Sequence, residues 1–256
     1  MTAAASIRHD APDSEASLSL SVFFPAYNDA DCLPELLART FQVVPRLTSD
    51  YEVIVVNDGS WDGTASVLER LVDLYRPHLK VITHETNRGY GAALRSGFTA
   101  AQKEVVFYTD GDGQYDVSEL EQLWKRMRPG VDLVNGYKLN RADHWFRALT
   151  GSVYNRLVRR LFALSIRDVD CDFRLIRHRV LTQIRCDSDS GSICVELMKK
   201  LQDLPCPFEE VGVHHYPRRH GRSQFFRPRS LVITFYQLFT LWVASSLRPE
   251  RRGEGS

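Results

Sequence analysis

The sequence of 256 residues contains little cysteine, and its arrangement excludes the common cysteine-based sites. The cysteines number five, an odd count, and no two of them have C-x-x-C spacing. Neither a structural zinc site nor a disulfide framework is therefore expected. Scattered reduced thiols are typical of cytoplasmic proteins, so we predict a cytoplasmic location. The cysteines are Cys32, Cys171, Cys186, Cys194 and Cys206.

The first residues also lack the pattern of a secretory leader. Residues 1–17 are rich in Ala, Ser and Asp, with neither a basic start nor an apolar run. This composition is not that of a signal peptide, and it predicts a disordered arm over residues 1–17. The last residues, 249–256, are predicted to form a second tail.

No apolar run reaches the length of about 20 residues that a membrane-spanning helix needs. The most apolar segment, Leu231–Ala244, carries Thr234, Gln237 and Thr240 at every third position, which predicts a helix with a narrow polar stripe. An interfacial helix usually has Lys or Arg on that stripe, and this segment has neither. We therefore expect a C-terminal apolar helix over residues 227–248 that is buried against the domain or against a second subunit through residues 231–244.

Arginines on both sides of this segment support an alternative, which is peripheral contact with the cytoplasmic face of a membrane. Basic residues beside an apolar segment are attracted to anionic lipid headgroups. These arginines are Arg227, Arg229, Arg248, Arg251 and Arg252.

Two phosphate-binding motifs are missing as well. The sequence has no G-x-x-x-x-G-K-[ST], and its first apolar run ends in Pro25-Ala-Tyr-Asn-Asp29 instead of a G-x-G-x-x-G motif. A bound nucleotide is therefore not held in the manner of P-loop or dinucleotide-binding proteins. The glycine-rich signature with a lysine that a nucleotidyltransferase should carry near its first strand is absent too.

Charge is balanced in total but not along the chain. Residues 1–135 hold 12 Lys and Arg against 20 Asp and Glu, whereas residues 136–256 hold 21 against 12, and the net charge is +1. An acidic half joined to a basic half fits a cleft that binds a metal ion on one side and an anion on the other.

Strand-like apolar runs alternate with helical periodicity through the first half. This alternation predicts an α/β fold whose mostly parallel central sheet has helices on both faces. We predict strands at 18–24, 52–57, 80–83, 105–109 and 131–134, helices at 32–44, 64–74 and 91–101, and Ser118 as the N-cap of a further helix. The second half is less regular, with helices expected at 147–162 and 193–201 and a strand at 210–216.

Polar residues follow three of the predicted strands at the point where each strand ends. Asn28 and Asp29 follow the first strand, Asp58 follows the second, and Asp110 and Asp112 follow the fourth. Ligands bind at the carboxyl ends of the strands in sheets of this kind. We therefore expect these side chains to line one site.

The segment Tyr108-Thr-Asp-Gly-Asp-Gly-Gln-Tyr115 carries the strongest chemical signal. Asp110 and Asp112 are two residues apart, and in an extended chain such residues point in the same direction, so both carboxylates can face one ion. Gln114 adds a neutral oxygen. Hard oxygen ligands of this kind suit Mg²⁺ or Mn²⁺, which complete their coordination with water and substrate phosphates.

Four motifs occur in a fixed order: Phe24-Pro-Ala-Tyr-Asn-Asp29, Val55-Val-Asn-Asp-Gly-Ser-Trp-Asp-Gly-Thr64, Asn87-Arg-Gly-Tyr-Gly91 and Asp110-Gly-Asp-Gly-Gln114. Together they resemble the inverting family 2 glycosyltransferases with the GT-A fold. The branch that they resemble most contains the dolichyl- and polyprenyl-phosphate mannose or glucose synthases. The resemblance covers roughly residues 18–224.

The resemblance implies a role for each matching residue. The nucleotide pocket would be lined by Pro25, Ala26, Tyr27 and Asp29, with Asp29 in place of the usual Glu, and Asp58 would accept a hydrogen bond from the base.

The same resemblance assigns the metal and the acceptor. Asp110 would lie near the ribose and the metal, while Asp112 and Gln114 would hold the metal on the diphosphate. Acceptor-phosphate cations would be Lys138, Arg147 and Arg219, and the catalytic set would be Asp110, Asp112, Arg147 and Arg219.

The second half also suggests which kind of acceptor is used. A hydroxyl acceptor needs a general base, whereas a phosphate monoester is already ionised near neutral pH and needs cations to position it. The Glu-Asp base of hydroxyl-directed relatives is not found, and only Asp187 and Asp189 remain as base candidates. The arginine-rich second half therefore favours a phosphate acceptor, with a soluble hydroxyl acceptor and a catalytically silent nucleotide-sugar-binding module as alternatives.

We thus predict a GT-A glycosyltransferase domain over residues 18–226, which transfers a hexose from a UDP- or GDP-sugar to a polyprenyl-phosphate-type acceptor with Mg²⁺ or Mn²⁺ as cofactor. No nucleic-acid partner is expected.

Overall fold

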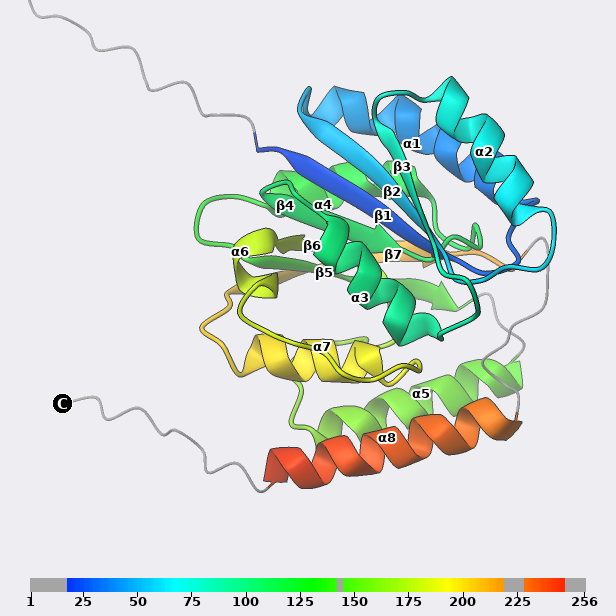
Figure 1. Cartoon of the computed structure of the whole chain (residues 1–256). Helices are drawn as coiled ribbons and strands as arrows, with labels where there is room; N and C mark the ends of the chain where they lie inside the picture. Colours follow the sequence, from blue (N-terminus) through cyan, green and yellow to red (C-terminus); the bar gives the residue numbers. More distant parts are fainter. Residues whose placement is uncertain (1–17, 142–144, 219–227, 247–256) are drawn as a thin grey trace, which may run out of the picture.

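The computed structural model describes residues 18–141, 145–218 and 228–246 (Figure 1). Its centre is a seven-stranded sheet with the strand order β3-β2-β1-β4-β6-β5-β7. The predicted α/β fold with a mostly parallel sheet is confirmed.

The acidic half builds the parallel part of the sheet. Here β1 pairs with β2 and β4, and β2 pairs with β3, all in parallel. The predicted elements are found with ends that move by a few residues. They are β1 (Leu20–Ala26), α1 (Leu33–Leu47), β2 (Tyr51–Asn57), α2 (Thr64–Leu74), β3 (Leu79–Thr83), α3 (Tyr90–Ala100) and β4 (Val105–Thr109).

The basic half completes the sheet with a change of direction. Strand β6 (Phe173–Arg177), which the sequence pattern did not predict, lies antiparallel between β4 and β5. Strand β5 then pairs in parallel with β7. The other elements of this half are η1 (Val117–Glu119), α4 (Leu120–Arg126), β5 (Leu133–Arg141), α5 (Trp145–Leu161), α6 (His178–Leu181), α7 (Ile193–Gln202), β7 (Phe208–His215) and α8 (Pro228–Ser246).

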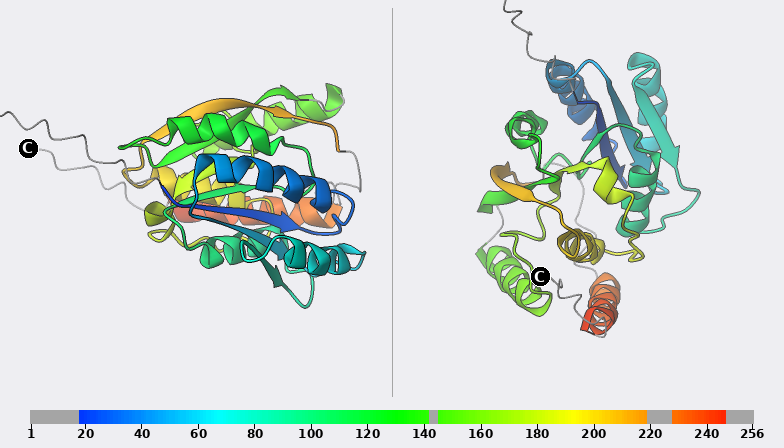
Figure 2. Two further views of the ribbon diagram at one scale, coloured as in Figure 1. Left: turned by 90° about the horizontal axis from the view of Figure 1, so that it is seen from above. Right: turned by 90° about the vertical axis from the view of Figure 1, so that its left-hand side faces the viewer.

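Apolar side chains on the two faces of the sheet form two cores. Val22 and Phe24 of β1 point to one face, where α1, α2 and α4 pack, and Phe23 points to the other, where α3, α6 and α7 pack. This alternation follows from the twofold side-chain period of a strand. The helices cover both faces of the sheet in Figure 2.

The prediction that Ser118 is the N-cap of a helix was wrong. Asp116 caps the helical segment instead, because its carboxylate accepts a hydrogen bond from the backbone N–H of Ser118 at 2.9 Å. A short turn of 3₁₀-helix, η1, then precedes α4.

Helices α5 and α8 lie on the α7 side of the sheet and farther from the sheet than α7 (Figures 1 and 2). Within the part of the chain that the structure describes, no helix is long and apolar enough to cross a bilayer.

The prediction that α8 is buried holds for only one side of the helix. Thr234 of the polar stripe is 4% exposed, whereas Tyr236 and Phe239 are 67% and 60% exposed. The inward side also contains Leu238, which is 6% exposed. Thr234 and Gln237 form hydrogen bonds there with Ser190 and Ser192, whereas Thr240 of the stripe is exposed.

A buried arginine ties the antiparallel strand to its neighbours. Arg174 of β6 is 0% exposed, and its guanidinium donates hydrogen bonds to Asn135 Oδ1 at 2.9 Å, to the carbonyl of Val169 at 2.6 Å and to Tyr108 Oη. It also forms an ion pair with Asp172 at 2.9 Å. A buried guanidinium is stable only because these acceptors form hydrogen bonds and an ion pair with it.

Replacing Arg174 with Met should therefore lower the free energy of unfolding by about 3 to 5 kcal/mol, because Asp172 loses its buried partner. Urea unfolding at neutral pH measures this change. As a control, Arg185→Met removes a pair with Asp187 whose arginine side chain is 90% exposed, and it should change stability by less than about 0.5 kcal/mol. Equal effects of the two substitutions would contradict a central role for Arg174.

Candidate active site

The carboxyl ends of β1, β2 and β4 meet at one edge of the sheet, as expected. The backbone N–H of Asp58, after β2, donates to the carbonyl of Ala26 at 2.9 Å. The N–H of Gly111, after β4, donates to the carbonyl of Pro25 at 3.1 Å. The motifs that follow β1, β2 and β4 are therefore joined through the last residues of β1.

Asp110 and Asp112 lie in a turn, so the expectation that they share a direction in extended chain was wrong. Strand β4 ends at Thr109, and Gly113 has a φ of +72°. Gly111 is required for close approach, since a Cβ at this position would lie 2.7 Å from the carbonyl oxygen of Pro25. The two carboxylates come near each other through this tight turn.

The site concentrates negative charge in a poorly solvated place. The pKa of Asp110 is held well above its usual range because the group is buried and faces Asp172 and Asp112. Tyr90 of α3 donates a hydrogen bond to Asp110 at 2.7 Å. Burial, and less strongly the charge of Asp112, raise the pKa of Asp29 from 3.8 to about 6.

Two arginines from the basic half offset part of this charge. Arg218, which follows β7, forms an ion pair with Asp112, and Arg174 forms one with Asp172. The attraction of Asp112 for the Arg218 guanidinium outweighs its partial burial, so the pKa of Arg218 is raised. Arg218 thus holds one carboxylate oxygen of Asp112, while the other accepts a hydrogen bond from the backbone N–H of Gln114 at 3.0 Å.

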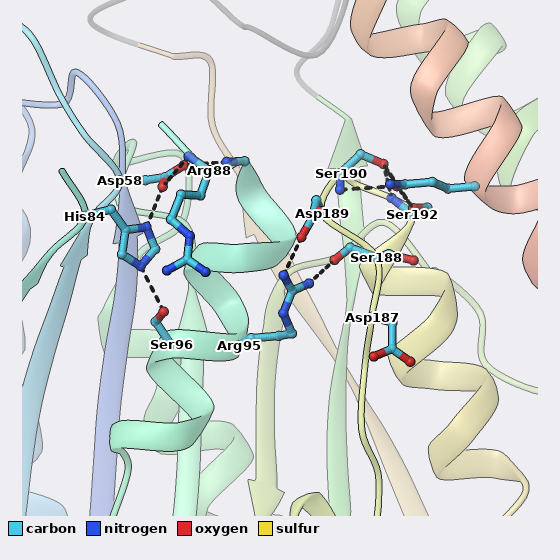
Figure 3. Close-up of polar contacts among 12 residues, drawn as sticks. Asp58, His84, Arg88, Arg95, Ser96, Asp187, Ser188, Asp189, Ser190 and Ser192 are labelled. Carbon is cyan, nitrogen blue, oxygen red and sulfur yellow. Dashed lines mark hydrogen bonds and ion pairs between the residues drawn. The ribbon is translucent and has the colours of Figure 1, made fainter. Parts of the chain in front are cut away.

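Asp58 binds the loop before α3 through backbone amides (Figure 3). Its carboxylate is 4% exposed and accepts hydrogen bonds from the N–H groups of Arg88 and Gly89, each at 2.9 Å. His84 Nδ1 lies 2.6 Å from the same carboxylate, and its Nε2 lies 2.9 Å from Ser96 Oγ. Asp58 therefore fixes the shape of the motif at residues 87–91. Its predicted hydrogen bond with the base of the nucleotide stays a prediction.

The two base candidates lie in a loop packed against the start of α3 (Figure 3). Arg95 forms an ion pair with Asp189, and the N–H of Gly91 donates to the carbonyl of Asp189 at 3.0 Å. Asp187 pairs with Arg185 at 3.2 Å and is 67% exposed. Both carboxylates pair with arginines of the chain itself, and their role as a general base stays a prediction.

The predicted acceptor-phosphate cations are only partly described. Lys138 donates to the carbonyl of Asp170 at 2.8 Å. Burial alone lowers its pKa, but Asp168 and the neighbouring acidic groups outweigh burial and raise it. The side chain of Arg147 and the whole of Arg219 lie outside the described residues.

Gln114, the third predicted metal ligand, donates a hydrogen bond through its side-chain amide to the carbonyl of Tyr216 at 3.0 Å.

Four residues of the site were not singled out from the sequence, namely His84, Asp172, Arg174 and Arg218. Asp172 repeats the D-x-D spacing together with Asp170, and this was the available signal. Arg218 lay in a basic run whose members the sequence does not distinguish. Nothing in the sequence marked His84.

Residues 21–185 match the family model for glycosyl transferase family 2. The chain therefore belongs to glycosyl transferase family 2, and it is a glycosyltransferase.

Curated relatives agree with the branch that the motifs indicated. Undecaprenyl-phosphate 4-deoxy-4-formamido-L-arabinose transferase of Proteus mirabilis is 30% identical over 233 residues, which cover 90% of this chain and 69% of that protein. The protein of the same name from Enterobacter sp. is 29% identical over 238 residues, covering 91% and 70%.

Solved structures share the fold. Glucosyl-3-phosphoglycerate synthase from Mycobacterium tuberculosis, in complex with Mn²⁺, UDP and phosphoglyceric acid, superposes with a TM-score of 0.67 at 16% identity, over 92% of this chain and 81% of that one. Its complex with Mg²⁺ and UDP gives a TM-score of 0.65 at 15% identity, over 92% and 82%. The expected GT-A fold is confirmed.

The raised pKa of Asp29 predicts a pH-dependent stability. Between about pH 4 and pH 6 the folded protein holds a proton on Asp29 that the unfolded chain has released, so stability falls as pH rises through this window. Asp29→Asn removes this titration. The stability of the variant relative to the natural protein should therefore increase from pH 4 to pH 6, as measured by urea unfolding at each pH.

The control is Asp73→Asn, whose carboxylate is 73% exposed and which should show a much smaller change across this window. A constant difference between the Asp29→Asn variant and the natural protein would show that Asp29 titrates normally in the folded state.

Proposed function

We propose that this glycosyltransferase moves a hexose, with inversion, from a UDP- or GDP-sugar to a polyprenyl-phosphate-type acceptor, with help from Mg²⁺ or Mn²⁺. The observation that supports it most is the junction of three sequence motifs at the carboxyl ends of β1, β2 and β4, with Asp110 and Asp112 at its centre. The proposed nucleotide pocket is lined by Pro25, Ala26 and Tyr27 with Asp29 and Asp58.

The donor set of the site fits a hard divalent cation. Asp110, Asp112 and Gln114 offer oxygens, and no group of three or more His, Cys, Asp or Glu able to hold a metal exists among the residues that the structure describes. A small set of protein ligands is typical of Mg²⁺ and Mn²⁺, which take water and substrate phosphates as further ligands. The synthase of the same fold is described with Mn²⁺ or Mg²⁺ and UDP, which supports the proposal.

When bound, the metal would neutralise the leaving diphosphate. The residues of the chain have separate tasks. Asp112 and Gln114 would hold the metal, and Asp110, which accepts a hydrogen bond from Tyr90, would lie near the ribose and the metal. Arg218, which pairs with Asp112, would lie near the diphosphate, and a guanidinium binds phosphate in a forked geometry.

The names of the relatives support a lipid phosphate as acceptor, since both are undecaprenyl-phosphate transferases. A phosphate acceptor needs cations and no general base. The candidates for this task are Lys138, Arg147 and Arg219. The engagement of Asp187 and Asp189 with arginines of the chain is consistent with a reaction that does not use them.

Calorimetric titration with UDP and with GDP, each with and without Mn²⁺, tests the proposed binding of the donor. We expect one nucleotide to bind in a Mn²⁺-dependent manner. Asp112→Asn should remove this dependence and lower transfer by at least about 100-fold, because a preorganised charge interaction at the diphosphate is lost. A folded protein that binds neither nucleotide would contradict the proposed donor site, and near-native transfer by the variant would disprove the metal role of Asp112.

Replacing Arg219 with Ala tests the proposed binding of the acceptor phosphate. The acceptor KM should rise, or kcat should fall, by about tenfold or more, because a charge-assisted hydrogen bond to phosphate is worth at least about 1.5 kcal/mol. Donor binding should change little. The matched variant Asp187→Asn should keep its activity, and an Asp187→Asn enzyme without activity would instead favour a hydroxyl acceptor with Asp187 as its base.

A further inference from the structure

The carboxylate of Asp58, which follows β2, already accepts several hydrogen bonds from the chain itself (Figure 3). Its Oδ1 accepts one from the ring of His84 at 2.6 Å and one from the backbone N–H of Arg88 at 2.9 Å. Its Oδ2 accepts one from the backbone N–H of Gly89 at 2.9 Å. An ionised carboxylate has about four acceptor positions, two on each oxygen. Within the described part of the chain, one position on Oδ2 is therefore left for a ligand.

His84 provides the side-chain donor of this set. Its Nδ1 faces an ionised carboxylate, which can only accept, so Nδ1 carries the hydrogen of this contact. Its Nε2 lies 2.9 Å from the hydroxyl of Ser96 on α3, and its backbone N–H donates to the carbonyl of Asn57 at 2.9 Å. These contacts hold the ring, which is 7% exposed, in one orientation. A fixed imidazole and a backbone amide thus close Oδ1 of Asp58 to a ligand.

The number of open acceptor positions decides which base can pair with this carboxylate. Uracil and thymine carry a single ring N–H, on N3, which needs one acceptor. Guanine carries two donors side by side, N1–H and the N2 amino group, which match the two oxygens of a carboxylate together. Cytosine and adenine have no hydrogen on the corresponding ring nitrogen, so its lone pair would face a carboxylate oxygen. A donor that is buried without an acceptor lowers affinity.

We propose that His84 makes the nucleotide site selective for uracil or thymine, so that the donor is a uridine- or thymidine-diphosphate sugar. Oδ2 of Asp58 accepts the N3–H of the base, while His84 keeps Oδ1 from the second donor of guanine. The inference deepens the proposed function, and it rests on the contact between Asp58 and the base that is proposed there. His84 acts through Asp58 without touching the base, so it is a positioning residue.

A purely structural role of His84 makes a different prediction. His84 also joins β2 to α3 through Asp58 and Ser96, so its loss alone would weaken the site as a whole. A weakened site loses affinity for every nucleotide by the same factor, whereas a change in the open acceptor positions alters the ratio between nucleotides. The ratio of the dissociation constants of GDP and UDP is therefore the quantity that tests the proposal.

Calorimetric titration of the full chain with UDP, dTDP, GDP and CDP, each with Mn²⁺, gives the preference of the natural protein. We expect UDP or dTDP to bind at least about tenfold more tightly than GDP and CDP, because guanine leaves a donor, and cytosine a lone pair, unmatched at Asp58. Both preferred nucleotides carry the N3–H, and the tighter binder of the two identifies the natural base.

Two substitutions separate the two ring contacts of His84. The side-chain amide nitrogen of Asn takes the place of Nδ1, and that of Gln takes the place of Nε2. His84→Asn should therefore keep the contact with Asp58 and the preference of the natural protein. His84→Gln should keep the contact with Ser96 but open one position on Oδ1. The affinity for GDP relative to UDP should then rise by about tenfold, the effect of one hydrogen bond to a charged group.

The matched control is His78→Gln. His78 directly precedes β3 and His84 directly follows it, so the control removes an imidazole at the opposite end of the same strand. Its Nδ1 lies 3.2 Å from the carbonyl of Tyr51, away from Asp58. This variant should bind every nucleotide as the natural protein does. Thermal unfolding should confirm that all variants are folded.

Two outcomes would overturn the proposal and leave the proposed function standing. One is binding of GDP by the natural protein that is as tight as that of UDP and dTDP, or tighter. The other is a His84→Gln variant whose affinities for GDP and UDP fall by the same factor. A folded natural protein that binds none of these nucleotides would instead reject the proposed donor site itself.

Discussion

Mutual repulsion of carboxylates at the carboxyl edge of the sheet is the constraint on which the rest of the structure depends. Asp29, Asp110, Asp112 and Asp172 influence one another, and burial raises the pKa of Asp29 and of Asp110. Such a group of charges is stable only if cations or protons offset it. The basic half supplies two arginines for this purpose, Arg174 within the sheet and Arg218 beside it.

The reversed strand carries one of these two counter-ions. β6 enters the sheet antiparallel between β4 and β5, and its position places Arg174 beside Asp172 and the hydroxyl of Tyr108. The same strand begins directly after Asp172, so one short segment contributes both an acid and its counter-ion. The division of the sequence into an acidic and a basic half has its structural counterpart in a different pair, in which Arg218 of the basic half meets Asp112 of the acidic half.

The first half could be predicted from the sequence because its elements are periodic and its polar residues stand where strands end. Helix α2 and strand β4 have the predicted ends, and the motifs after β1, β2 and β4 meet as expected. The second half could not be predicted in the same way. β6 was missed because Arg174 interrupts its apolar pattern, and only tertiary contacts explain an arginine that is 0% exposed. The polar stripe of α8 was predicted, but the partners of Thr234 and Gln237, which are Ser190 and Ser192, are distant in sequence.

The way in which Asp58 holds the loop before α3 has a consequence for how this protein can change over evolution. Its carboxylate binds the backbone amides of Arg88 and Gly89, not their side chains. Every residue except proline offers such an amide, so position 88 is free to vary without loss of the loop's shape. Gly59 has no such freedom, because a Cβ there would lie 2.3 Å from the backbone nitrogen of Asn87. Substitutions should therefore accumulate at position 88, while Asp58 and Gly59 persist as a pair.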